Sequence, residues 1–191
     1  METKNIMIVG VGGQGTLLAS RVLGRVLLTE GYDVKISEVH GMSQRGGSVV
    51  TYVRYGEKVY SPIIDPGQVD LLLAFEQLEA YRWLPYLKAD GRMVVNTQKL
   101  SPMPVITGSQ KYPAGLPEKL QEACEGVILM DALSLAKEAG NTKTANVVLL
   151  GRLAREMEIS KEAWVTALRE IVAPKFIQVN KKAFALGYQE N

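Results

Sequence analysis

The amino-acid sequence predicts an α/β fold in which helices cover both faces of a mostly parallel sheet. The first reason is a short apolar run at 5–9 that ends in glycines and precedes a helix pattern and a second strand pattern. Such a strand–helix–strand order is typical of a βαβ unit, because parallel strands require a crossover connection. The second reason is that strand-length apolar runs alternate with amphipathic segments as far as residue 130. We therefore expect a three-layer, Rossmann-like architecture with a β-hairpin and a helical C-terminal region.

The N-terminal part of the chain is expected to hold one helix and three strands. The helix keeps its apolar residues on one face, and Gly31 suits the position after a helix end. The third strand is rich in Val, Thr and Tyr, which favour strands. Gly56 and Glu57 then predict a tight hairpin turn with a return strand at 58–60. In order, the expected elements are a strand at 5–9, a helix at 16–30, a strand at 32–40, a loop at 41–47 and a strand at 48–55.

The remainder of the chain is expected to alternate strands and helices and then to become helical. Residues 65–67 indicate a turn, and the proline-rich segment 98–117 indicates a long extended excursion with a short strand at 105–107. All 191 residues are expected to form one domain, with a helical tail from about residue 142. The expected strands are 69–75, 92–96 and 127–130, and the expected helices are 76–87, 117–125, 131–139, 142–157, 160–171 and 174–186.

Composition excludes several classes of function. Twenty-two Lys and Arg residues against 20 Asp and Glu residues give a formal charge of +2, too balanced for a generic nucleic-acid binder. Cys124 is the only cysteine and His40 the only histidine, so a zinc site or an iron–sulfur cluster held by this chain alone is excluded. The apolar runs are too short to span a membrane, and no signal-peptide pattern precedes the first strand. We expect a cytoplasmic protein that binds neither nucleic acid nor membrane.

A glycine-rich turn after the first strand is the strongest local motif. Gly10, Gly12 and Gly15 have the spacing and the context of the dinucleotide fingerprint, with Gly13 and Gln14 between them. The turn predicts either a phosphate or carboxylate site at a helix N-terminus or a tight connection packed against a neighbour. A nicotinamide cofactor would also need an acidic residue after the second strand, and Glu38 lies 23 residues past Gly15.

A second glycine-rich loop occupies the place where an adenosine would lie. We expect this loop, at 41–47, to sit beside the first one at the carboxyl edge of the sheet. Within it, Arg45 suits an anionic ligand or a partner's carboxylate, or is a surface arginine in a loop. No catalytic residue and no metal ligand is predicted. The candidate cofactor-binding residues of both loops are Gly10, Gly12, Gly13, Gln14, Gly15, Arg45, Gly46 and Gly47.

Other polar residues have two interpretations each. Glu38 and His40 are two residues apart in a predicted strand, so they point to the same face. They are either an acid–base pair or a structural pair in which the histidine is simply hydrogen-bonded. Glu76 and Glu79 suit a solvated helix start, and Asn96 either reaches the crevice or forms a turn. Cys124 is expected to be inert packing.

Several longer motifs resemble one enzyme family. The stretches 9–15 and 37–49, which contain the two glycine loops, are similar to the gamma-type domain of 2-oxoacid:ferredoxin oxidoreductases. The stretches 70–76 and 144–151 also resemble that family, and within it the indolepyruvate branch. Because the similarity runs along nearly the whole chain, it covers far more than the glycine fingerprint.

The resemblance implies an accessory subunit. Such enzymes decarboxylate a 2-oxoacid, here an aryl 2-oxoacid such as indolepyruvate, to its acyl-CoA and pass electrons to ferredoxin. Thiamine diphosphate and iron–sulfur clusters are then expected on a partner alpha subunit, with a coenzyme A contact at the glycine loops of this chain. The isolated chain is expected to be inactive and to form a homodimer. Alternatives are an NAD(P)-dependent Rossmann oxidoreductase and a non-catalytic scaffold subunit.

Overall fold

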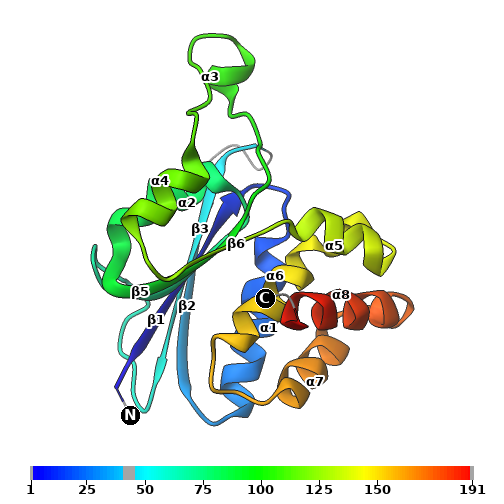
Figure 1. Cartoon of the computed structure of the whole chain (residues 1–191). Helices are drawn as coiled ribbons and strands as arrows, with labels where there is room; N and C mark the ends of the chain where they lie inside the picture. The colour runs from blue at the N-terminus through cyan, green and yellow to red at the C-terminus, as the bar shows by residue number, and fades with distance from the viewer. Residues whose placement is uncertain (1, 41–45, 190–191) are drawn as a thin grey trace.

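A computed structural model describes residues 2–40 and 46–189, with the His40 side chain left out. One six-stranded sheet runs through the middle of the molecule in the order β2-β3-β1-β4-β5-β6 (Figure 1). Only β3 is antiparallel to its neighbours, so the sheet is mostly parallel, as expected. The strands are β1 (Lys4–Val11), β2 (Asp33–His40), β3 (Ser48–Gly56), β4 (Val69–Ala74), β5 (Leu87–Asn96) and β6 (Val127–Met130).

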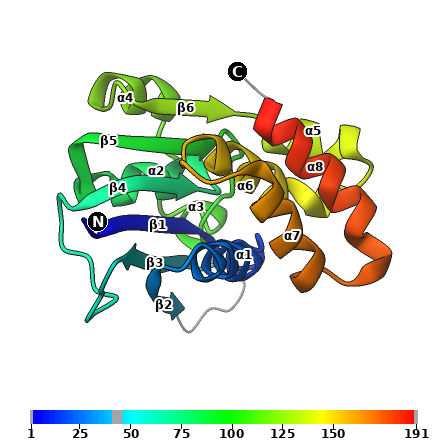
Figure 2. The same ribbon diagram turned by 90° about the horizontal axis from the view of Figure 1, so that it is seen from below.

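Helices cover both faces of this sheet, which confirms the three-layer α/β prediction. Helices α2 and α4 lie on one face, and α1 and α5 to α8 lie on the other (Figures 1 and 2). The α-helices are α1 (Thr16–Thr29), α2 (Gln77–Trp83), α3 (Met103–Ile106), α4 (Leu116–Ala123), α5 (Ala132–Ala139), α6 (Ala145–Arg155), α7 (Lys161–Ile171) and α8 (Ile177–Gln189). Single 3₁₀ turns are η1 (Leu84–Tyr86), η2 (Thr142–Thr144) and η3 (Pro174–Phe176).

Apolar residues on both faces of the central strands explain why the first strand reads as a continuous apolar run. In β1, Ile6 and Ile8 pack with α1 and the C-terminal helices, whereas Met7 and Val9 pack with α2 and α4. Strands β4 and β5 alternate in the same way, because successive side chains of a strand point to opposite faces. The sheet therefore separates two apolar cores.

The strand order corrects the predicted βαβ unit. Strands β1 and β2 are not neighbours, because β3 lies between them and pairs antiparallel with both, Val50 standing opposite Val9 and Val39. The predicted return strand at 58–60 is wrong: these residues are described and form no strand. Instead Val59 is buried and its N–H donates to Asp33 Oδ2 at 2.9 Å. The antiparallel partners of β3 are thus β2 and β1, which bury it on both edges.

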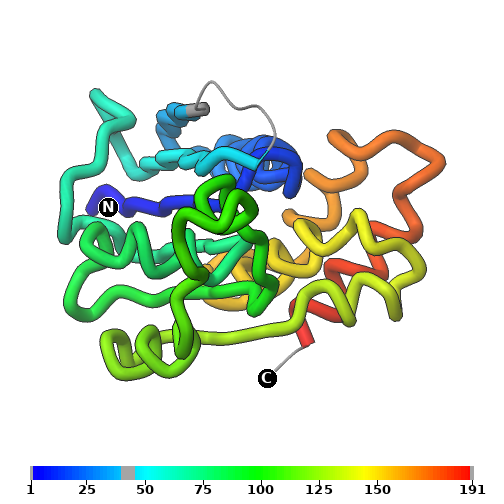
Figure 3. The backbone as a smooth tube through the Cα atoms, turned by 90° about the horizontal axis from the view of Figure 1, so that it is seen from above, coloured from blue at the N-terminus to red at the C-terminus, as the bar shows by residue number. Residues whose placement is uncertain are grey.

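The excursion after β5 projects from the body and is called the arm here, residues 98–115. Figure 1 shows it standing beyond the edge of the sheet at which β1 ends, and in the view from above in Figure 3 it lies in front of the sheet. Its predicted strand at 105–107 is wrong, since Met103–Ile106 form the short helix α3. Pro102 and Pro104 favour this outcome, because proline is tolerated in the first helical turn and cannot donate to a strand ladder.

The C-terminal helices pack tightly on the rest of the chain. Helices α6 and α8 cross where Gly151 and Gly187 face the opposite backbone, and α7 packs against α1. Trp164 of α7 and Phe184 of α8 are fully buried and stack with their centroids 6.2 Å apart. The helical region predicted after residue 131 is therefore present as α5 to α8. Among the described residues, no helix combines the length and apolar character that a membrane crossing needs.

Candidate functional site

A cavity of about 680 Å³ opens at the carboxyl edge of the sheet. It lies where β1, β4 and β5 end, next to the starts of α1 and α6, the place where open α/β sheets bind ligands. Its lining residues are Gly12, Gly13, Gln14, Gly15, Phe75, Asn96, Gln98, Leu100, Leu133, Thr142, Lys143, Ala145, Asn146 and Leu149.

The first glycine loop forms one wall of the cavity and needs glycine at two positions. Gly13 and Gly15 have φ angles of 100° and 85°, which side chains rarely adopt. A Cβ at Gly15 would also stand 2.5 Å from Nδ2 of Asn146, whose amide donates to the Gly15 carbonyl at 3.3 Å. This contact joins the start of α1 to the start of α6.

Gln14 holds the loop in place. Its Oε1 accepts from the Val11 N–H at 2.8 Å, and its Nε2 donates to the Phe75 carbonyl at 2.9 Å and to Gln98 Oε1 at 3.4 Å. Both amide protons of Gln14 are therefore used within the chain. The side chain therefore positions the cavity wall, and because Gln14 also lines the cavity, its contact with a ligand stays a prediction.

The described end of the second glycine loop, Gly46 and Gly47, lies beside the first loop. The Gly12 N–H donates to the Gly47 carbonyl at 2.8 Å, and the Gly46 N–H donates to the Gly12 carbonyl at 3.3 Å. These bonds extend the antiparallel β1–β3 ladder past Val11 and Ser48, so they do not depend on a parallel β1–β2 contact.

The remaining described candidates, Gly10, Gly46 and Gly47, do not line the cavity. Gly10 has a packing role, because a Cβ there would lie 2.9 Å from the Phe75 Cβ. Arg45 falls outside the described residues.

The electrostatics of the cavity favour an anion. Helices α1 and α6 both begin at its wall, and neither has a side-chain cap among the described residues. The first N–H groups of α1 lack intrahelical acceptors, whereas at α6 the Ala145 N–H donates to the Thr142 carbonyl and the Val147 N–H donates to Asn146 Oδ1 at 2.9 Å. Each helix dipole still favours negative charge by roughly 0.3–1 kcal/mol. Lys143 is the only charged side chain among the described residues that line the cavity. A ligand with an anionic group therefore fits this site better than a neutral or cationic one.

Sequence reasoning missed part of this site. Lys143, Thr142 and Gln98 come to the cavity from segments that carry no motif of their own. Asn146 lies in the stretch 144–151, which the family resemblance included without a role. A lysine in the first turn of the helix predicted at 142–157 is the local signal that could have indicated Lys143.

Three polar residues near the cavity, Glu76, Glu79 and Asn96, are almost fully buried. Glu76 and Glu79 are 1% and 4% exposed, so the prediction of solvated carboxylates is wrong. Glu76 caps α2 through the N–H groups of Leu78 and Glu79, and Glu79 accepts from Ser48 Oγ. Asn96 does reach the crevice, where its Nδ2 donates to the Phe75 carbonyl at 3.1 Å.

The nicotinamide alternative lacks its acidic residue. Glu38 accepts from Ser20 Oγ at 2.6 Å, and β3 separates its strand from β1 by two strand spacings, about 10 Å in all. Glu38 is therefore not beside the first loop, where a ribose-binding carboxylate would have to lie.

Cys124 is buried, its Sγ lies 3.6 Å from the Gly91 carbonyl, and burial raises the pKa of its thiol. The described residues contain no group of three His, Cys, Asp or Glu side chains suited to a metal.

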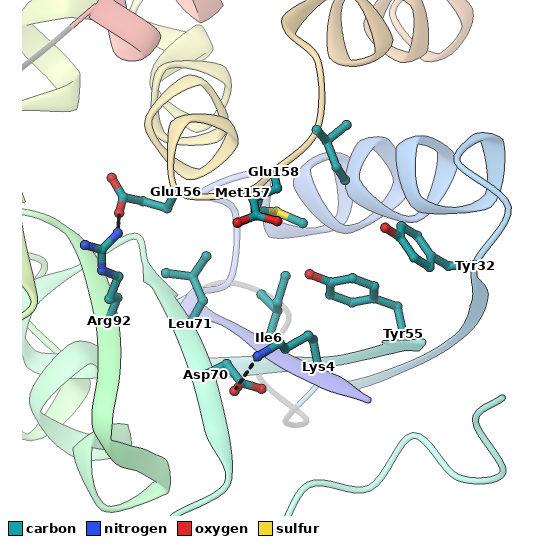
Figure 4. Close-up of a pocket in the computed structure, with 11 residues that line it drawn as sticks. Lys4, Ile6, Tyr32, Tyr55, Asp70, Leu71, Arg92, Glu156, Met157 and Glu158 are labelled. Carbon is teal, nitrogen blue, oxygen red and sulfur yellow. Dashed lines mark hydrogen bonds and ion pairs between the residues drawn. The ribbon is translucent and has the colours of Figure 1, made fainter. Parts of the chain in front are cut away.

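A second cavity, of about 440 Å³, lies at the opposite edge of the sheet (Figure 4). Its charged residues pair largely with one another, Lys4 with Asp70 at 3.8 Å and Arg92 with Glu156 at 2.5 Å. Burial and nearby negative groups raise the pKa of Tyr55 to about 12. This cavity lacks both the helix N-termini and the glycine loops, so the carboxyl-edge cavity is the stronger candidate.

Comparison with known proteins adds an independent finding. The family model for pyruvate ferredoxin/flavodoxin oxidoreductase matches residues 5–190. Indolepyruvate oxidoreductase subunit IorB of Thermococcus kodakarensis is 44% identical over 192 residues, which cover 98% of this chain and 95% of the relative.

Two solved structures share the fold. The gamma subunit of a keto/oxoacid ferredoxin oxidoreductase from Geobacter sulfurreducens PCA has a TM-score of 0.71 at 25% identity, over 97% of this chain and 96% of that one. A structure of 2-oxoglutarate:ferredoxin oxidoreductase from Magnetococcus marinus, with 2-oxoglutarate, coenzyme A and succinyl-CoA bound, has a TM-score of 0.76 at 19% identity. That match covers 98% of this chain and 31% of the longer one, and shows the fold alone.

Proposed function

The chain belongs to the pyruvate ferredoxin/flavodoxin oxidoreductase family, and we propose that it is the accessory subunit of an indolepyruvate:ferredoxin oxidoreductase. The observation that carries the proposal is the 44% identity to a named indolepyruvate oxidoreductase subunit along nearly the full length of both chains. The complex would convert an aryl 2-oxoacid to its acyl-CoA and reduce ferredoxin. Residues 1–191 would form a single domain, because α6 to α8 pack onto α1 and the sheet.

The redox and thiamine chemistry is proposed to reside on a partner alpha subunit. An iron–sulfur cluster needs about four cysteine ligands, whereas this chain has only the buried Cys124. When the partner is absent, we propose that the chain self-associates, because apolar side chains such as Met103 and Ile106 are 60% and 65% exposed.

Coenzyme A is the ligand class that we propose for the carboxyl-edge cavity. Its diphosphate and 3′-phosphate supply the negative charge that Lys143 and the starts of α1 and α6 favour. The cavity, at about 680 Å³, would hold part of this large cofactor, and the partner subunit would cover the rest. The residues of this chain would bind and orient the cofactor, without taking part in bond making.

Reconstitution tests the proposed function. The isolated chain is expected to show no 2-oxoacid decarboxylation, whereas its complex with a thiamine- and cluster-bearing partner should reduce ferredoxin or a viologen dye with indolepyruvate and coenzyme A. Activity is measured with indolepyruvate, pyruvate and 2-oxoglutarate in parallel. Turnover of indolepyruvate by the isolated chain with thiamine diphosphate, or saturable NADH binding to it, would contradict the proposal.

Substitution of Lys143 tests the ligand assignment. Lys143→Met should raise the KM for coenzyme A in the complex about fivefold, equivalent to roughly 1 kcal/mol, because one charge near the phosphates is lost. The effect should shrink as salt is added. Lys119→Met is the matched control, since Lys119 is exposed on α4 and does not line the cavity. Equal KM values for the two variants would contradict a role for Lys143 in coenzyme A binding.

A further inference from the structure

One buried carboxylate joins three separate segments beside the cavity. Glu76 lies two residues after the end of β4 and directly before α2, is 1% exposed and accepts four hydrogen bonds. Its Oε2 accepts from the N–H groups of Leu78 at 2.7 Å and Glu79 at 3.0 Å, which caps α2. Its Oε1 accepts from the Leu100 N–H at 3.2 Å and from the Tyr112 hydroxyl. A carboxylate offers about four lone pairs, so this one is fully used.

The two donors to Oε1 stand on opposite legs of the arm. Leu100 lies on the leg that leaves β5, between β5 and α3, and Tyr112 lies on the leg that returns from α3 to α4. A single oxygen atom therefore draws both legs together at the base. Gln77 strengthens the outgoing leg, because its Nε2 donates to the Thr97 carbonyl at 2.9 Å.

The outgoing leg is also a wall of the candidate ligand cavity. Gln98 and Leu100 both line it. Gln98 Oε1 accepts from Gln14 at 3.4 Å and from Asn96 at 3.3 Å, which connects the leg to the first glycine loop. Movement of this leg would change the shape of the cavity at Gln98 and Leu100.

We infer that Glu76 is a positioning residue, which clamps both legs of the arm and so fixes the cavity wall that the ligand contacts. The inference rests on the proposed coenzyme A site and adds to it a residue that touches neither cofactor nor substrate. Burial and the neighbouring Glu76 raise the pKa of Tyr112, so its hydroxyl remains a donor at neutral and moderately alkaline pH.

Two variants separate the clamp from the helix cap. Glu76→Asp keeps a good N-cap for α2 but shortens the side chain by one methylene, so it no longer reaches both legs. Tyr112→Phe removes only the hydroxyl of the returning leg. Tyr81→Phe is the matched control, because Tyr81 is 42% exposed on α2 and is not one of the four donors to Glu76. None of the three substitutions alters the charge near Lys143.

The experiment has one readout for the clamp and one for the ligand. In the full chain, amide hydrogen exchange at Leu100 and tryptic cleavage after Lys99 and Lys111 report the opening of the arm. In the reconstituted complex, steady-state kinetics give KM for coenzyme A and kcat. Glu76→Asp and Tyr112→Phe should speed exchange and cleavage about fivefold or more and raise KM about fivefold, with kcat nearly unchanged. Tyr81→Phe should match the wild type in every measurement.

Each outcome decides one part of the inference. Unchanged exchange and cleavage in both clamp variants would overturn the clamp. A loosened arm with an unchanged KM would overturn the positioning role and leave Glu76 as a purely structural residue. A wild-type complex that does not require coenzyme A would instead contradict the proposed function, while the exchange data would still report on the clamp.

Discussion

Gly187→Ala is expected to destabilise the chain by about 3 kcal/mol, which corresponds to a melting temperature lower by roughly 10 °C. A Cβ at Gly187 would lie 1.9 Å from the Val148 carbonyl oxygen and 2.7 Å from its carbon. These are backbone atoms within α6, so neither can turn aside as a side chain does. Relief requires that α6 and α8 move apart, which would open the core around Trp164 and Phe184.

Gly24→Ala is the matched control for this effect. Gly24 is also a helical glycine, but a Cβ there would meet only Ile36 Cδ1, at 2.7 Å, the flexible end of a half-exposed side chain. The gain in helix propensity, up to about 1 kcal/mol, offsets the shift of Ile36, so stability should stay within about 1 kcal/mol of the wild type. Thermal unfolding by circular dichroism measures both variants. Equal melting temperatures would show that the α6–α8 crossing tolerates a side chain at Gly187.

Gly15→Ala is expected to give the largest functional effect, a rise in KM for coenzyme A of about tenfold or more, roughly 1.4 kcal/mol. The φ of 85° costs a side chain about 1–2 kcal/mol, and the new Cβ would stand 2.5 Å from Asn146 Nδ2. Asn146 must then leave the Gly15 carbonyl, which separates the starts of α1 and α6 at the cavity wall. Kinetics of the reconstituted complex give the KM.

Gly140→Ala controls for the backbone strain alone. Gly140 has a φ of 108° at the end of α5, and a Cβ there would meet nothing within 4 Å. Gly140→Ala should lower the melting temperature only by the effect of the strained φ, and it should leave the KM for coenzyme A unchanged. If Gly15→Ala and Gly140→Ala had the same KM, the contact with Asn146 would have no part in ligand binding.

Local sequence patterns were sufficient for most elements, because those elements depend on neighbouring residues. The helix at 16–30 and the strand at 127–130 are present within one residue of the predicted limits. The arm was predicted as an excursion from its prolines, although its strand at 105–107 proved to be α3. The strand predicted at 92–96 begins at Leu87 in the structure. The sequence did not indicate its first half, because those residues are only partly buried and carry a weak apolar pattern.

By itself the sequence determined the fold class, the two glycine loops and the family, since periodicity and motifs are properties of consecutive residues. Only the tertiary structure decided that β3 lies between β1 and β2, because strand order depends on which edges pair rather than on any local pattern. It also decided the burial of Glu76, the approach of Asn146 to Gly15 and the presence of Lys143 in the lining of the same cavity. Residues 131 positions apart, such as Gly15 and Asn146, meet because α1 and α6 pack on the same face of the sheet, a contact that local sequence cannot encode.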